Sequence, residues 1–160
     1  MRRLTPIFAT VLLLAGAGCQ SIEVEKALVI TDVNSGWYDA GVQDDGMNKL
    51  VPSISFRLRD QIDEPVSGVM INAIFRRVNE EEAWGEHFVK AIGQEALAPG
   101  ATSRAIVLRS NLGYTGTEPR LVMLKHREFV DAKVELFAKQ GRRTWVKIGE
   151  YPIARQLLTQ

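Results

Sequence analysis

Few residues of this 160-residue chain have the types and the spacing that catalysis or metal binding would need. There are two histidines, His87 and His126, and the second lies two residues before Glu128. A zinc site takes three or four ligands, and no third ligand is recognisable beside this pair. None of the serines lies in the G-x-S-x-G or S-x-x-K motif of a serine hydrolase. We therefore expect a protein that is not an enzyme and that holds neither a metal nor a cofactor.

An acidic stretch offers the remaining candidate for metal binding. Asp39, Asp44 and Asp45 lie in a segment that also contains glycines, and their carboxylates could hold calcium. The order of residues in 44–48 does not match the alternating oxygen ligands of an EF-hand loop. We therefore expect a solvated turn at this place rather than a calcium site.

The single cysteine, Cys19, follows a segment that is typical of an export signal. Arg2 and Arg3 give a basic start, residues 7–14 are almost all apolar, and residues 15–18 are small. The apolar run is too short to cross a bilayer, because a transmembrane helix needs about 20 residues. The sequence therefore predicts a signal peptide over residues 1–18.

The sequence Ala17-Gly18-Cys19 resembles the lipobox of bacterial lipoproteins, although Gly16 stands where that family prefers leucine. The resemblance implies that the Cys19 sulfur carries a diacylglycerol and that the chain is cut before this residue. Ordinary cleavage after Ala17 is the alternative. Gln20 follows the cysteine instead of aspartate, which by the same resemblance favours the outer membrane. We expect a lipid-anchored protein that faces the periplasm, with residues 19–26 as its lipidated N-terminus and short tether.

The net charge of the chain limits the partners that we expect. The chain has 20 Lys and Arg against 19 Asp and Glu, and the signal peptide removes Arg2 and Arg3, so the mature net charge is −1. A near-neutral domain is not steered towards nucleic acid or anionic lipid, and nucleic acid is not an expected partner. Arg142 and Arg143 could meet a phosphate, but adjacent strand residues point to opposite faces and do not form a patch.

The elements that must position all these residues are strands. Apolar and polar residues alternate most clearly in 50–58, which is typical of a half-buried strand. Turn residues separate the candidate strands, and helical patterns are limited to a turn at 79–82 and the tail 153–158. We predict one all-β domain over 27–160, an immunoglobulin-like antiparallel sandwich, with a closed barrel as the alternative. The predicted strands are 28–33, 50–58, 69–75, 86–92, 105–109, 130–138 and 144–151.

Residues 52–109 also resemble a known family. The strand Ser53 to Leu58, the turn at Pro65-Val66, the strand Val69 to Phe75 and the turn Ala98-Pro99-Gly100-Ala101 are similar to the FxLYD type of bacterial immunoglobulin-like domain. The chain departs from that family at residues 59–61, where asparagine is common, and it lacks the aromatic-Asp pair after the second strand. The resemblance implies a sandwich fold and an envelope location, and it carries no catalytic residue.

Four aromatic residues are the best candidates for a binding site. Trp37, Tyr38, Trp84 and Tyr114 fall in the first, third and fifth predicted connections. Successive connections of a simple antiparallel domain alternate between its two ends, so all four are expected at one end. Two interpretations remain open: a binding site on loops, or a small cluster that packs beneath them.

The expected function follows from this placement. We expect a non-catalytic envelope lipoprotein that acts as a protein-interaction or accessory module. The alternative is a small-ligand or glycan-binding lipoprotein that uses the aromatic residues. A pocket lined by Trp37 and Tyr114 would favour the small ligand, whereas a flat exposed patch would favour a protein.

Overall fold

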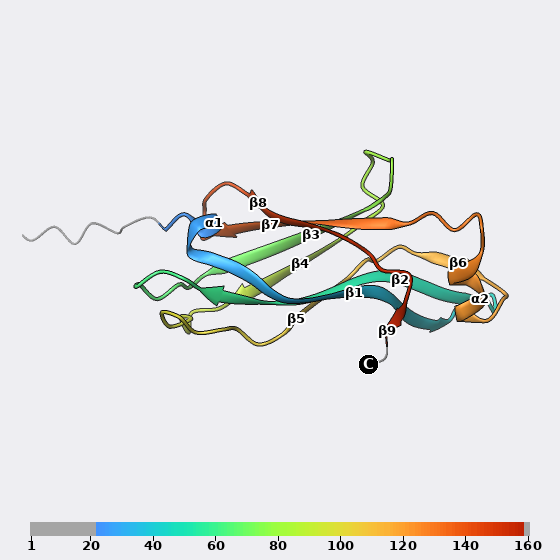
Figure 1. Cartoon of the computed structure of the whole chain (residues 1–160), viewed down its shortest axis with the longest axis horizontal. Coiled ribbons are helices and arrows are strands. Elements are labelled where there is room, and N and C mark those ends of the chain that lie inside the picture. Colours follow the sequence, from blue (N-terminus) through green and yellow to red (C-terminus); the bar gives the residue numbers. More distant parts are fainter. Residues whose placement is uncertain (1–21, 159–160) are drawn as a thin grey trace, which may run out of the picture.

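The computed structural model describes residues 22–158, which form two β-sheets packed face to face (Figure 1). The first sheet has the strand order β5-β2-β1-β9, and β6 pairs with β2 as well. The second sheet has the order β4-β3-β7-β8. Neighbouring strands are antiparallel except for β1 and β9, which are parallel. The strands are β1 Leu28–Val42, β2 Asn48–Asp60, β3 Val69–Arg77, β4 Gly85–Ile92, β5 Ile106–Arg109, β6 Tyr114–Gly116, β7 Ala132–Gln140, β8 Val146–Pro152 and β9 Leu157–Leu158, and the helices are α1 Val24–Ala27 and α2 Arg120–Lys125.

This arrangement confirms the predicted all-β sandwich. The described residues hold nine strands instead of about seven, and the two unforeseen strands are the short β6 and β9. The predicted signal peptide, residues 1–18, and the predicted lipidation site, Cys19, lie outside the described residues.

The alternation within β2 has the predicted direction. Leu50, Ile54, Phe56 and Leu58 are at most 1% exposed and belong to the core between the sheets. Each large apolar side chain that is fully buried in this way contributes about 1.5–3 kcal/mol to folding. The second sheet supplies the opposite wall through Val69, Ile71, Ala73 and Phe75 of β3 and Ala132, Val134, Leu136 and Ala138 of β7.

β1 is much longer than the sequence predicted. Its pairing with β2 shifts register between Thr31 and Asn34, and Asp32 has a φ of 53° there. A β-bulge inserts an extra residue and so interrupts the period-two pattern. The alternation is lost at this bulge, which explains why the prediction ended the strand at Val33 although it continues to Val42.

Both ends of the described chain differ from prediction. Val24 and Ala27 of α1 are buried in the core, so the folded domain begins inside the predicted tether. The tail 153–158, predicted as helical, instead crosses to the first sheet. The Trp37 backbone N–H donates to the Gln156 carbonyl oxygen at 2.8 Å, and β9 then pairs with β1. The apolar pair Leu157–Leu158 is compatible with a strand as well as with a helix. It forms a strand because the edge of β1 is available to pair with it.

The antiparallel strands define two ends of the sandwich. The end that carries α1 and the connections 61–68, 93–105 and 141–145 is called the proximal end (Figure 1). The opposite end, which carries the β1–β2 turn, β6 and α2, is called the distal end. The connections between the seven predicted strands therefore alternate between the ends, as the sequence argument assumed, whereas the short β6 continues in the direction of β5 along β2.

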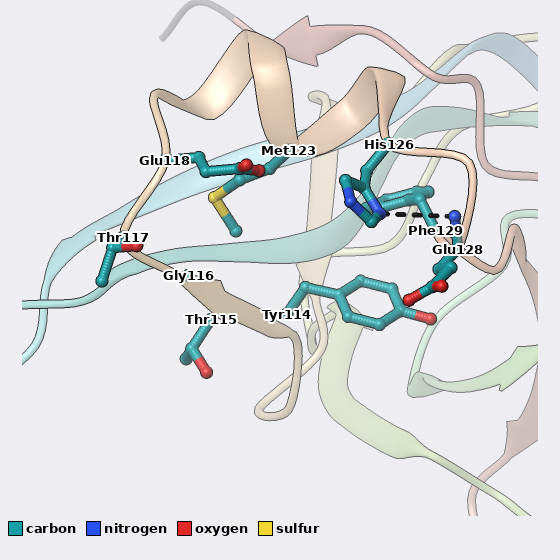
Figure 2. Close-up of a pocket in the computed structure, with 9 residues that line it drawn as sticks. All are labelled: Tyr114, Thr115, Gly116, Thr117, Glu118, Met123, His126, Glu128 and Phe129. Carbon is teal, nitrogen blue, oxygen red and sulfur yellow. Dashed lines mark hydrogen bonds between the residues drawn. The ribbon is translucent and has the colours of Figure 1, made fainter.

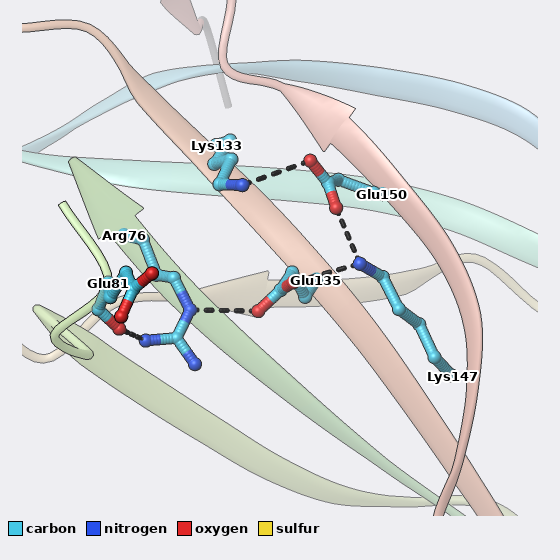
Figure 3. Close-up of polar contacts among 6 residues, drawn as sticks. All are labelled: Arg76, Glu81, Lys133, Glu135, Lys147 and Glu150. Atoms are coloured by element: carbon cyan, nitrogen blue, oxygen red, sulfur yellow. Dashed lines mark hydrogen bonds and ion pairs between the residues drawn. The ribbon is translucent and has the colours of Figure 1, made fainter. Parts of the chain in front are cut away.

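Charged side chains tie three strands together on the outer face of the second sheet (Figure 3). Glu135 of β7 lies 2.8 Å from the Arg76 guanidinium of β3 and 2.8 Å from the Lys147 ammonium of β8. Lys147 also pairs with Glu150 at 2.5 Å, and Lys133 reaches Glu150 at 3.1 Å. The hydrogen bond from Arg76, and then that from Lys147, lowers the pKa of Glu135 to about 2.

Glu135→Gln is expected to lower the free energy of unfolding at pH 7 by about 1 kcal/mol, the upper range for partly exposed ion pairs. The folded state holds the pKa of Glu135 at about 2, below that of the unfolded chain. Its contribution is therefore complete above about pH 5 and is lost as the pH falls towards 2. Urea unfolding at several pH values should show the difference between variant and parent shrinking across this range.

Glu86→Gln is the matched control for this measurement. Glu86 and Glu135 flank Ile74 on the two neighbouring strands, and Glu86 makes no ion pair with any residue of 22–158. A difference that is equal for both variants, or that grows at low pH, would contradict the role of Glu135.

Candidate functional site

Four aromatic rings pack together towards the distal end of the sandwich, and we call them the aromatic cluster: Trp37, Trp84, Tyr114 and Phe129. The Trp37 ring centroid lies 4.6 Å from that of Phe129, 5.6 Å from that of Tyr114 and 6.1 Å from that of Trp84. Tyr114 is 4.9 Å from Trp84 and 4.7 Å from Phe129. These separations fall in the range that stabilises aromatic pairs.

The cluster is built from distant parts of the chain. Trp37 lies within β1, so its predicted place in a connection is wrong, and the bulge that hid the rest of β1 explains the error. Tyr114 begins β6, and Trp84 directly precedes β4. The predicted meeting of Trp37, Trp84 and Tyr114 is nevertheless confirmed, because the connections between the predicted strands alternate between the two ends.

Tyr38 does not join the cluster, contrary to the prediction. Adjacent residues of a strand point to opposite faces of the sheet. Since Trp37 faces inwards, Tyr38 lies on the outer face, where the Arg109 guanidinium carbon is 3.6 Å from the centroid of its ring. Tyr38, which the sequence also placed in a connection, is part of β1 as well.

Burial within the cluster is uneven. Trp37 is completely buried and its indole N–H has no hydrogen-bond partner among residues 22–158, whereas Trp84 and Tyr114 are half-buried. The Tyr114 hydroxyl donates to the Val130 carbonyl oxygen at 3.2 Å, and burial raises the pKa of Tyr114. Trp37 therefore acts as packing, as the second interpretation held. A binding role for Trp84 and Tyr114 stays a prediction.

Phe129 was missed by the sequence argument. The predicted strand 130–138 placed Val130 on the inward face, but β7 begins at Ala132 and Val130 is 38% exposed. Phe129 is 7% exposed instead and packs edge-on against Trp37. Two adjacent apolar residues just outside a strand cannot be assigned to a face by alternation alone.

A pocket of about 330 Å³ adjoins the cluster at the distal end (Figure 2). The rings of Tyr114 and Phe129 and the Met123 side chain provide its apolar lining. His126 and Glu128 line it as well, and His126 Nδ1 accepts the Glu128 backbone N–H at 3.3 Å. Trp37 does not line the pocket, so the arrangement that would favour a small ligand is only half present.

The predicted metal candidates are used in other contacts. Asp39 pairs with Arg120 of α2 at 2.8 Å, and Asp45 accepts the Met47 N–H within the β1–β2 turn. His87 Nδ1 accepts the Arg109 N–H at 3.1 Å and so links β4 to β5. Within residues 22–158, no three His, Cys, Asp or Glu side chains come together to hold a metal ion.

α2 presents apolar side chains to solvent at the distal end. Leu121 is 58% exposed and Val122 is 47% exposed, while the next two residues, Met123 and Leu124, are buried. The Arg120–Asp39 pair holds the helix against β1. We call Leu121 and Val122 the α2 apolar pair. Other exposed apolar residues near this end are Val42, Leu112 and Val130.

No protein-family model, curated protein or solved structure matches this chain. The resemblance of residues 52–109 to FxLYD domains therefore stays a prediction. Neither helix within residues 22–158 has the length and hydrophobicity needed to span a membrane.

Trp37→Ala is expected to lower the free energy of unfolding by about 3–5 kcal/mol, because it leaves a large cavity between the sheets. Trp37→Phe should cost much less, since it keeps a ring in contact with Phe129 and removes an unpaired indole N–H. Urea unfolding of both variants measures the two losses. A loss below about 1 kcal/mol for Trp37→Ala would contradict the packing role.

Proposed function

We propose that this protein is a non-catalytic envelope lipoprotein that contacts another protein through the distal end of its sandwich. The observation that carries the proposal is the α2 apolar pair, Leu121 and Val122, at that end. Large contiguous apolar patches are rare on monomeric proteins and commonly mark contact sites. The distal end also holds Val42, Leu112 and Val130.

The lipid anchor gives this end its direction. The proposal takes Cys19 as the lipidated residue, by resemblance to the lipobox, and the outer membrane as its location, facing the periplasm. Only Gln20 and Ser21 separate Cys19 from Ile22, which limits the reach of the tether to about 10 Å. Since α1 lies at the proximal end, the distal end is the part of the domain farthest from the anchor and is open to partners in the aqueous space.

Binding of a small ligand or a glycan is the second candidate function. The pocket lined by Tyr114, Met123 and Phe129 favours it, because ligand sites combine an apolar lining with a few polar groups. The buried position of Trp37 weighs against it, since this ring offers no face to a sugar. Protein contact is therefore the first proposal.

Cys19→Ser should move the protein from the membrane fraction to the soluble periplasm, because the variant lacks the sulfur that receives the diacylglycerol. Cell fractionation together with metabolic palmitate labelling measures both consequences. A variant that remains with the membranes and still incorporates palmitate would show that the anchor is elsewhere.

A photo-crosslinking residue placed at Leu121 or Val122 of the full lipidated chain is expected to yield a discrete adduct with an envelope protein. The same residue at Val107 of β5 is the matched control, because Val107 and Val122 are each 47% exposed. Equal adducts at Val107 and Val122, or none at either position, would contradict protein contact through α2. A ligand that stabilises the protein against heat in the second case would favour the alternative function.

A further inference from the structure

The outer face of the second sheet changes character along the strands. In one row across the sheet, Lys90 and Lys139 flank Met70, and in the next row Phe88 and Phe137 flank Asn72. The third row, towards the distal end, holds Glu86, Glu135 and Glu150 around Ile74. The face is therefore basic towards the proximal end, aromatic in the middle and acidic beyond.

The acidic row is largely neutralised and the basic row is not. Glu135 and Glu150 pair with the cations shown in Figure 3. Lys90, Lys139 and Arg142 form no ion pair with any side chain of residues 22–158. Their charges remain available to an anionic surface.

Aromatic side chains accompany these free cations. The Trp145 ring meets the Phe88 ring edge-on, with centroids 5.9 Å apart, and the Lys139 ammonium lies 4.8 Å from the Trp145 centroid. Phe88 is 55% exposed although it lies in the middle of a strand. We call Phe88, Lys90, Lys139, Arg142 and Trp145 the basic–aromatic patch.

The patch begins beside the point where the chain enters the domain. The 141–145 turn lies against the N-terminal segment, and Arg143 Nη1 donates to the Ile22 carbonyl oxygen at 2.8 Å. Residues 22–25 and 142–144 line one hollow together. If Cys19 is lipidated, the reach of about 10 Å from Cys19 to Ile22 keeps this turn close to the lipid headgroups.

We propose that the basic–aromatic patch rests on the anionic headgroup layer of the membrane and tilts the sandwich onto this face; this inference rests on the lipid anchor proposed above. Tryptophan favours the membrane–water interface, and lysine and arginine near it are attracted to anionic lipid. The net charge of −1 expected for the mature chain does not oppose this contact, because a tethered domain needs only a local patch within a Debye length. Asp63 lines a different hollow, with Val29 and Arg59 of the first sheet, and so lies apart from the patch. Glu23 and Glu25 line the same hollow as Arg142, but Glu23 pairs with Lys26, which leaves Glu25 against the three cations of the patch.

The test uses the full lipidated chain, purified and incorporated into vesicles of phosphatidylethanolamine and phosphatidylglycerol with brominated acyl chains. Bromine should quench part of the tryptophan fluorescence, and Trp145→Phe should abolish that part, since Trp37 is buried between the sheets and Trp84 belongs to the aromatic cluster towards the distal end. Vesicles with phosphatidylcholine in place of phosphatidylglycerol should quench much less. Lys139→Gln with Arg142→Gln should lower the ratio of docked to undocked protein about thirtyfold at low salt.

The matched control is Lys125→Gln with Arg127→Gln, which removes two exposed charges at the distal end and should leave quenching unchanged. Vesicle flotation separates the two proposals. If the protein floats with the vesicles but Trp145 is not quenched, the membrane contact of the patch is contradicted and the lipid anchor is not. If the protein fails to float, both proposals are contradicted. Quenching that is equal in both kinds of vesicle, or equal in both charge variants, also overturns the patch. If the Trp145 fluorescence in detergent changes with protein concentration, this face contacts a second copy of the chain, and the proposed membrane contact is contradicted.

Discussion

The packing of Trp37 between the sheets is the contact on which the distal half of this sandwich depends. Its ring packs against the rings of Tyr114 and Phe129. Both residues belong to segments that have little regular structure of their own. Three-residue strands and six-residue helices are too short to be stable alone. β6, α2 and the 126–131 connection are therefore held in place by burial of their side chains around this one indole.

That dependence separates the two roles open to the aromatic residues. A ring that is needed for packing is not free to move towards a ligand, and the buried indole N–H of Trp37 has no partner among residues 22–158. Trp84 and Tyr114 keep part of their surfaces exposed, and the apolar pair on α2 lies beyond them. A rigid interior that presents apolar side chains at its outer rim suits contact with another folded protein.

Alternation alone predicted the all-β sandwich, the core face of β2 and the meeting of Trp37, Trp84 and Tyr114. It failed wherever the period of two was interrupted or too short to measure. The bulge at Asp32 hid the second half of β1 and with it the strand position of Tyr38. β9 depends on the free edge of β1, and Phe129 depends on the end of β7, neither of which leaves a periodic signal.

The same limit applies to charge. Net charge and the adjacency of Arg142 and Arg143 argued against a basic surface, because neighbouring side chains on a strand diverge. The pair lies in the turn between β7 and β8, as the predicted strand bounds already implied, so the rule for strands does not apply to it. Arg143 binds the Ile22 carbonyl oxygen there and Arg142 is exposed. Lys90 and Lys139, 49 positions apart in the sequence, become neighbours because each lies opposite Met70. A patch of this kind depends on the register in which the strands pair, and the amino-acid composition contains no information about that register.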